Sequence, residues 1–129
     1  MILVDTSVWI DHLRQGDRTL ADLLERGLVL THPFVIGEIA CGSLNRRSSI
    51  LQLLADLPAA AVAQHAEAMA FIDRHTLHGK GIGYIDVHLL ASVALTPSAR
   101  LWTRDKRLHA IASEIGNAQT HHYWAATGN

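Results

Sequence analysis

The sequence predicts an α/β protein in which helices cover both faces of a central parallel sheet. Short apolar runs without alternation, at 2–4, 28–31 and 101–103, are typical of strands buried on both faces of such a sheet. Amphipathic stretches with helical periodicity separate these runs, and Gly or Pro residues end them. Strands that alternate with helices imply right-handed crossovers and parallel pairing.

The chain opens with the strand 2–4, which stops at Asp5. Thr6 and Ser7 are then candidate N-caps of a helix, because a hydroxyl oxygen can accept a hydrogen bond from an unpaired backbone N–H. Gly16 marks the end of this helix. Its apolar stripe consists of Val8, Trp9, Ile10 and Leu13.

A second amphipathic helix ends at Gly27, directly before the strand 28–31. Pro33 suits the first turn of the next helix, because its missing N–H would have no helical partner there. Glu38 interrupts the apolar stripe of that helix, which is formed by Phe34, Val35 and Ile39.

Residues 46–78 have helical periodicity with a break at Pro58, which predicts a helical hairpin. The glycine-containing loop 78–83 leads into a helix that stops near Pro97.

The third predicted strand, 101–103, is followed by Asp105, which opens a helix that stops at Gly116. The C-terminal tail is expected to add an edge strand to the sheet.

Length and composition narrow the class of protein. With 129 residues, 49% hydrophobic and 18% charged, the chain is expected to fold as one globular domain over 1–129. Asp5 interrupts the apolar N-terminus, so neither a signal peptide nor a membrane span is expected. A single cysteine, Cys41, fits a reducing compartment, and we expect a cytoplasmic protein without a membrane partner. The net charge of −1 leaves RNA contacts to local basic patches.

Four acidic side chains occupy special places in this pattern. Asp5 and Asp105 come directly after buried strands, at the carboxyl edge where open α/β sheets place their ligand sites. Glu38 and Asp86 lie in the early part of helices, on or beside the apolar stripe. A carboxylate that points inward is unstable unless it is protonated, paired or bound to a metal. These acids therefore predict a cation site.

The oxygen-only donor set indicates a hard ion, Mg²⁺ or Mn²⁺. Such an ion is the usual means of activating water to attack a phosphodiester. The competing interpretation of an Asp at a strand end is a helix N-cap, which is the commoner role of any one such residue. Four coincident placements favour the metal site.

The four acids lie in segments with recognisable sequences: ILVDTSVWI around Asp5, VIGEI around Glu38, GYID at Asp86 and LWTRD at Asp105. These segments resemble those of PIN-domain nucleases and, within that family, of the VapC toxins of bacterial and archaeal toxin–antitoxin modules. Their order and spacing over the whole chain form a specific signal, and no acidic position departs from the family's pattern.

The resemblance implies a three-layer α/β/α fold and an Mg²⁺- or Mn²⁺-dependent endoribonuclease that is the toxin of a type II module. It implies a homodimer, inhibition by a cognate VapB-type antitoxin and an RNA substrate, commonly tRNA in this family. Thr6 and Thr103 would orient carboxylates or water. The catalytic acids of the metal site would be Asp5 and Asp86, as first choices for direct ligands, with Glu38 and Asp105 acting through water.

Basic side chains supply candidate RNA contacts, because lysine and arginine bind backbone phosphates. One cluster adjoins Asp105, whereas the other has a solvated helix start as an equally good interpretation. The candidates are Arg104, Lys106 and Arg107 in the first cluster and Arg46 and Arg47 in the second.

Other residues have simpler interpretations. His88 is expected to be a packed or surface residue, because it faces away from Asp86 on a helix. The adjacent His121 and His122 point in different directions, which favours solvated side chains over a metal site. Trp124 is a candidate for stacking on bases, and Cys41 is expected to be a small core residue.

Three other functions compete with a nuclease. A phosphoacceptor signalling domain has a similar order of elements but needs an acceptor Asp at a central strand end, and Asp56 lies in a helical pattern. A dinucleotide-binding enzyme needs a glycine-rich turn where residues 6–9 stand. A non-catalytic binding protein would not need intact acids at all four positions.

Overall fold

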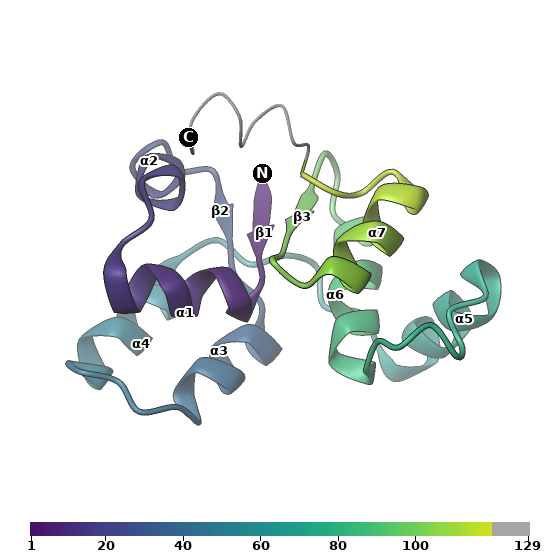
Figure 1. The fold of residues 1–129 in the computed structure, drawn as a ribbon, viewed down its shortest axis with the longest axis horizontal. Helices are drawn as coiled ribbons and strands as arrows, with labels where there is room; N and C mark the ends of the chain where they lie inside the picture. The colour runs from purple at the N-terminus through teal and green to yellow at the C-terminus, as the bar shows by residue number, and fades with distance from the viewer. Residues whose placement is uncertain (120–129) are drawn as a thin grey trace.

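Three short strands form a parallel sheet in the order β2-β1-β3 (Figure 1). The computed structural model describes residues 1–119. Ile2 of the central strand pairs with Val29 on one side and with Arg100 on the other. The strands are β1 (Ile2–Val4), β2 (Val29–Leu30) and β3 (Arg100–Trp102). This parallel sheet confirms the predicted α/β class.

Helices lie on both sides of the strands, with α1 and α2 at the left of Figure 1 and α6 and α7 at the right. The arrangement is the three-layer α/β/α fold that the sequence predicts. None of the helices within residues 1–119 combines the length and the apolar character needed to cross a bilayer. The helices are α1 (Thr6–Gln15), α2 (Arg18–Glu25), α3 (Pro33–Ala40), α4 (Arg47–Asp56), α5 (His65–His75), α6 (Tyr84–Leu95) and α7 (Lys106–Ile115).

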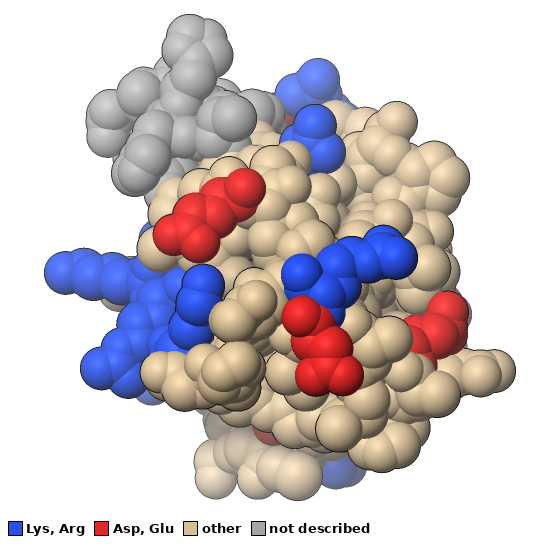
Figure 2. All heavy atoms as spheres, turned by 90° about the vertical axis from the view of Figure 1, so that its right-hand side faces the viewer, with Lys and Arg blue, Asp and Glu red and all other residues tan. Residues whose placement is uncertain are grey.

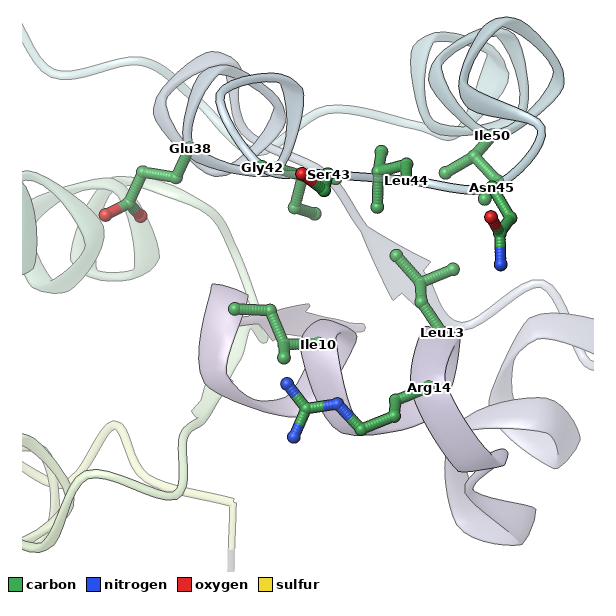
Figure 3. Close-up of a pocket in the computed structure, with 10 residues that line it drawn as sticks. Ile10, Leu13, Arg14, Glu38, Gly42, Ser43, Leu44, Asn45 and Ile50 are labelled. Atoms are coloured by element: carbon green, nitrogen blue, oxygen red, sulfur yellow. The ribbon is translucent and has the colours of Figure 1, made fainter.

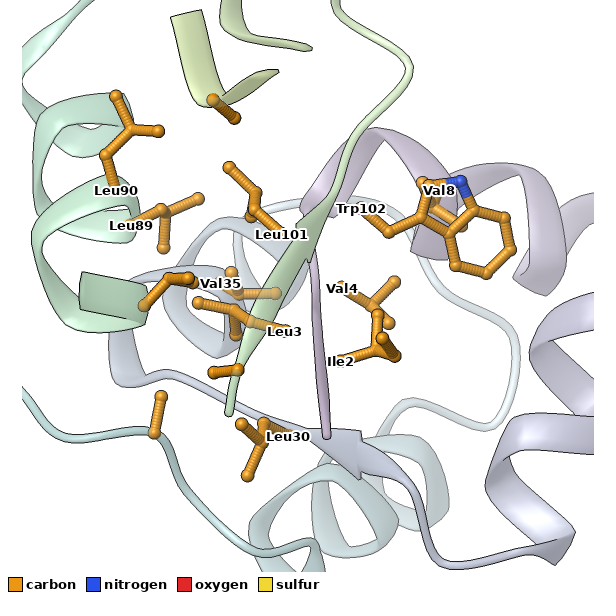
Figure 4. Packing of buried hydrophobic residues seen from close by; sticks show 14 of the residues in the cluster. Ile2, Leu3, Val4, Val8, Leu30, Val35, Leu89, Leu90, Leu101 and Trp102 are labelled. Carbon is orange, nitrogen blue, oxygen red and sulfur yellow. The ribbon is translucent and has the colours of Figure 1, made fainter. Parts of the chain in front are cut away.

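The strands are buried on both faces, as their unalternating apolar sequences predict. Leu3 and Leu101 point toward α6, whereas Val4 and Trp102 point to the other face of the sheet, where Val8 of α1 lies (Figure 4). All five side chains are at most 3% exposed. This packing fixes the ends of β1 and β3, where two of the candidate acids follow.

The predicted helical hairpin over 46–78 is wrong. α4 packs against α3, α5 packs against α6, and an extended segment separates α4 from α5. In that segment Thr31 N donates to Pro58 O (2.8 Å), and Ala60 N donates to Thr31 O (2.9 Å). Helical periodicity predicted both α4 and α5. The segment between them pairs through its backbone with Thr31, at the end of β2, and keeps the two helices apart.

The chain after α7 returns to the sheet. Leu101 N donates to Asn117 O (2.7 Å), and Gln119 N donates to Leu101 O (2.9 Å), so residues 117–119 run beside β3. The remainder of the predicted edge strand lies outside the described residues, as do His121, His122 and Trp124.

Candidate active site

Asp5 ends β1 and stands at the N-cap position of α1, but its side chain does not cap that helix. Its Oδ2 instead accepts hydrogen bonds from Ser7 Oγ (2.8 Å) and Thr103 Oγ1 (2.7 Å). Asp5 is only 8% exposed, so these two hydroxyl donors satisfy a carboxylate that is almost completely buried. Parallel pairing of β1 with β3 brings Thr103 to this position.

The prediction that Thr6 or Ser7 caps α1 is wrong, because both lie in its first turn. Thr6 Oγ1 donates to Glu38 Oε1 (2.7 Å), while Ser7 Oγ donates to Asp5 and accepts from Arg104 N (3.1 Å). Ser7 is therefore a site residue that the sequence analysis missed. The available signal is a hydroxyl two residues after a strand-end carboxylate, a spacing at which local hydrogen bonds form.

Two helices carry the next two acids. Asp86 is half-buried in the first turn of α6, where its Oδ2 accepts from Gly83 N (3.2 Å). Glu38 lies in the second half of α3 and is exposed. Both acids were expected early in a helix, on or beside its apolar stripe. This is correct for Asp86 and wrong for Glu38, whose side chain is exposed and accepts a hydrogen bond from Thr6.

Asp105 caps α7, because its Oδ1 accepts from Leu108 N (2.9 Å). The helix-cap interpretation is therefore correct for this residue. Its backbone N also donates to Thr103 Oγ1 (3.1 Å). One hydroxyl thus connects two acids, donating to the Asp5 carboxylate and accepting from the Asp105 backbone.

The four acids form one electrostatic group, the acidic cluster of Asp5, Glu38, Asp86 and Asp105. Burial is the main factor that raises the pKa of Asp86, and the charges of Asp5, Asp105 and Glu38 raise it further. The hydrogen bond from Gly83 N partly opposes this shift. A divalent cation would reverse the effect by favouring ionised carboxylates.

The oxygens of the acidic cluster suit a hard cation. In each acid a protein donor holds one carboxylate oxygen, and the other oxygen has no donor within residues 1–119. In that same range no group of three or more His, Cys, Asp or Glu side chains is arranged to hold a metal ion. Mg²⁺ usually takes one or two carboxylates and completes its shell with water and phosphate oxygens. The cluster therefore fits a divalent ion in donor chemistry and charge, without a closed set of protein ligands.

The basic residues near Asp105 differ in whether acidic side chains already pair with their charges. Arg104 forms ion pairs with Asp11 (2.8 Å) and Asp17 (2.6 Å), which direct its guanidinium toward α1 and the start of α2. Lys106 and Arg107 are exposed in the first turn of α7, and neither has an ion-pair partner within the described part of the chain.

The second basic pair lies at the exposed start of α4. Arg47 Nη2 donates to Ala40 O (3.0 Å), so it binds the C-terminal end of α3, where a cation is favourable. Arg46 precedes α4 in a left-handed conformation. Cys41 is exposed in the turn after Ala40, so the prediction of a core cysteine is wrong, because α3 ends before Cys41 can turn inward.

His88 is packed, as expected. It is 3% exposed, and its ring lies 4.8 Å from Phe34 and 4.5 Å from Tyr84, both in edge-to-face contact. Burial lowers the pKa of His88, and the charge of His65 lowers it further. The imidazole is therefore neutral at physiological pH.

A second histidine, His32, is completely buried at the N-cap of α3. Its Nδ1 accepts from Phe34 N (3.0 Å), and its Nε2 lies 3.0 Å from Ser92 Oγ. Burial, with a smaller contribution from His88, lowers the pKa of His32 to about 4. This histidine is a structural residue rather than a ligand of the acidic cluster.

A cavity of about 530 Å³, here called the α1–α3 groove, adjoins the acidic cluster at Glu38 (Figure 3). Ile10 and Leu13 of α1 form one wall, facing the segment that joins α3 to α4. The opposite apolar residues are Ile39, Leu44 and Ile50, and Arg14 and Asn45 add polar groups. The groove thus offers an apolar surface that ends at a carboxylate.

Comparison with known proteins agrees with this architecture. The PIN domain family matches residues 2–114, a range that contains the whole acidic cluster. Ribonuclease VapC32 of Mycobacterium tuberculosis, from the strains CDC 1551 / Oshkosh and ATCC 25618 / H37Rv, is 51% identical over 118 residues. The alignment covers 92% of this chain and 95% of that relative. The chain therefore belongs to the PIN-domain family and, within it, to the VapC ribonucleases.

Proposed function

We propose that this protein is a metal-dependent endoribonuclease and the toxin of a type II toxin–antitoxin module in the cytoplasm. The acidic cluster carries the proposal, because the charges of three other carboxylates raise the pKa of Asp86 and because one oxygen of each acid has no donor among residues 1–119. Ribonuclease VapC32, by its name, hydrolyses RNA, and this supports the same reaction here.

Asp5 and Asp86 would hold Mg²⁺ or Mn²⁺ directly, and Glu38 and Asp105 would act through water. The bound ion supplies Lewis-acid stabilisation of the phosphate and a lowered pKa for water. Ser7 and Thr103 hold the Asp5 carboxylate in place.

Hydrolysis adds water across a phosphorus–oxygen bond of the RNA backbone. Glu38, oriented by Thr6, accepts the proton that the attacking water loses, and the leaving ribose oxygen takes a proton from solvent. The chain's own part is to position charged oxygens before substrate arrives, so that little reorganisation is needed during the reaction.

The test is cleavage of a structured RNA, with total tRNA as the first choice, by purified protein free of antitoxin. We expect cutting with Mg²⁺ or Mn²⁺, none with EDTA, and none by Asp5→Asn. Asp22→Asn is the matched control, because Asp22 pairs with Arg26 on the exposed face of α2 and should leave cleavage unchanged. Equal cleavage in EDTA would overturn the metal-dependent mechanism.

A VapB-type antitoxin is the proposed protein partner. The α1–α3 groove supports this, because an apolar partner segment seated there would lie next to Glu38 and obstruct the approach of RNA. Expression of the toxin alone should arrest growth, and co-expression of the product of a small adjacent gene should relieve the arrest.

A homodimer is the proposed state of the free protein. Exposed apolar side chains on and near α5 and α6 support it, because such surfaces commonly mark protein contacts. They are Val62 (50% exposed), Met69 (46%) and Leu95 (47%). Light scattering on the purified protein would measure its mass, and a monomer at working concentration would contradict the proposal.

A further inference from the structure

Tyr84 is the first residue of α6, two positions before Asp86, and neighbours hold its ring from two sides. Its hydroxyl forms a hydrogen bond with His65 Nδ1 at the start of α5. His88, one turn further along α6, meets the ring edge-to-face at 4.5 Å. Tyr84 nevertheless remains 43% exposed. A fixed aromatic ring with an open surface therefore stands in the first turn of α6, the turn that also carries Asp86.

The contacts of the Tyr84 ring are with His65 and His88 rather than with the acidic cluster, and folding does not require an exposed tyrosine at the start of a helix. His88 and Phe34 continue the aromatic contacts beneath Tyr84, with ring centroids 4.8 Å apart. A ring held in this way loses little further entropy when a flat ligand stacks on it. Proteins bind unpaired RNA bases on such aromatic surfaces.

Arg107 reaches the same loop from α7. Its side chain lies on the backbone of Gly81, since a Cβ at residue 81 would stand 2.6 Å from Arg107 Nη1. Gly81 also has a φ of +80°, a conformation that is unfavourable for any residue with a side chain. Within residues 1–119, no carboxylate pairs with Arg107. The Arg107 guanidinium thus lies against the loop that leads into α6, and it has no ion-pair partner among the described residues.

Basic side chains group locally on the side of the molecule formed by α5, α6 and α7, although the protein's net charge is −1. Figure 2 shows a group of lysine and arginine side chains projecting from the left edge of this face, with separate acidic and basic side chains over the rest of it. Local grouping of this kind provides phosphate contacts that the overall charge does not predict.

We propose that Tyr84 and Arg107 form a subsite for an unpaired nucleotide of the RNA next to the acidic cluster, which deepens the nuclease function proposed above and rests on it. The base stacks on the open side of Tyr84, and Arg107 binds a backbone phosphate. His65 is a positioning residue that acts through the Tyr84 hydroxyl. Gly81 and Tyr84 are three residues apart, so their Cα atoms lie within about 11 Å, a span that a short RNA segment covers.

Binding to a short fluorescein-labelled single-stranded RNA tests this subsite, measured by anisotropy over a salt series. All variants carry Asp5→Asn so that the RNA stays intact. Adding Tyr84→Leu should weaken binding roughly tenfold without changing the salt dependence, because stacking involves no counterion release. Adding Arg107→Ala should reduce the slope of log K against log salt by roughly 0.7. Tyr84→Phe should bind as the parent does, because it keeps the ring.

Two matched controls separate this subsite from general surface effects. Leu53→Ala removes a similarly exposed apolar side chain from α4, and Arg26→Ala removes an exposed arginine from the C-cap of α2. Both should bind RNA as the parent does. His65→Ala should weaken binding only when Tyr84 is present, and this double-mutant comparison isolates the positioning role.

Quenching of an RNA that contains 2-aminopurine gives a direct signal of stacking, and we expect it for the parent and Tyr84→Phe but not for Tyr84→Leu. If thermal melting shows that Tyr84→Leu is unfolded, His65→Ala tests the same subsite, because it keeps the Tyr84 ring and removes the side chain that positions it. Unchanged binding by Tyr84→Leu and Arg107→Ala, in a protein whose wild type cuts RNA, would overturn the subsite alone. Absence of both cutting and binding would overturn the proposed function as well.

Discussion

Thr103 Oγ1 donates a 2.7 Å hydrogen bond to Asp5 Oδ2 and accepts a 3.1 Å bond from Asp105 N, so one buried hydroxyl sets the positions of two acids. Thr103→Val keeps the shape of the side chain and removes both bonds. A hydrogen bond to a charged group contributes about 1.5–3 kcal/mol, so we expect kcat for RNA cleavage to fall roughly ten- to 100-fold. Thr103→Ser should restore most of the rate.

Thr31→Val is the matched control for this prediction. Thr31 also follows a strand and is 3% exposed, but its Oγ1 has no hydrogen-bond partner in the described part of the chain. Replacing an unpaired buried hydroxyl with a methyl group should leave stability equal or higher and cleavage unchanged. If both valine variants cut RNA at the wild-type rate, Thr103 does not position the acids.

The charge of Asp86 should destabilise the metal-free protein. Its pKa is raised in the folded state, so the folded protein binds more protons than the unfolded chain between the ordinary pKa of 3.8 and the raised value. The free energy of unfolding therefore falls as pH rises through that window and stays lowered above it. Asp86→Asn removes the charge and keeps an oxygen for Gly83 N. At pH 7 in EDTA, we expect a higher Tm for the variant than for the wild type.

Magnesium should reverse this order, because a bound cation stabilises the folded wild type and has less affinity for the neutral variant. The measurement is thermal unfolding with EDTA and then with Mg²⁺, alongside cleavage assays in which Asp86→Asn is expected to be inactive. Asp56→Asn, on the exposed surface of α4, provides the control and should shift neither melting curve appreciably. A lower Tm for Asp86→Asn in EDTA would contradict the destabilising effect of the buried Asp86 charge.

Strand-end patterns predicted the fold and two of the four acids of the acidic cluster. Asp5 and Asp105 follow strands that the sequence marks by short unalternating apolar runs, and parallel pairing then places both at one edge of the sheet. The position of Glu38 could not be derived in this way, because its approach to the site depends on α3 packing against α1, a contact that periodicity within one helix does not determine.

Hydrogen-bond partners were harder to predict than positions. Helix propensity treats Thr6 and Ser7 as alternative caps, but the chain places both in the first turn of α1, where their hydroxyls meet acids from α3 and β1. The Tyr84–His65 contact joins residues 19 positions apart on α6 and α5, and α5 was predicted to pack against α4 instead. Such pairs depend on tertiary packing and have no local sequence signal.

The buried histidine His32 should make the protein less stable in acid. Its pKa is about 4 in the folded state, below the ordinary value of 6.5, so the unfolded chain takes up a proton first as pH falls. The stabilising effect of the neutral imidazole is complete above pH 6.5 and is lost as pH falls from there toward 4. His32→Asn keeps an N-cap acceptor for Phe34 N but does not titrate. Denaturant unfolding between these pH values should show a slope smaller by at most about 1.4 kcal/mol per pH unit in the variant. An unchanged slope would exclude His32 as a source of acid sensitivity.

The apolar α1 wall of the α1–α3 groove should bind the antitoxin without taking part in RNA cleavage. Ile10 is 44% exposed on the α1 wall of the groove, so Ile10→Asp introduces a charge into an apolar contact while leaving the core intact. We expect antitoxin affinity to fall at least tenfold, as for a buried contact at the centre of an interface, while the cleavage rate stays at the wild-type value. Leu53→Asp is the matched control, because Leu53 is 51% exposed on α4 and does not line the groove. Calorimetric titration with the cognate antitoxin measures the affinities, and a matching assay follows RNA cleavage at increasing antitoxin concentration. Equal inhibition of Ile10→Asp and Leu53→Asp would place the antitoxin on another surface, whereas escape of Ile10→Asp alone would identify the groove as its binding site.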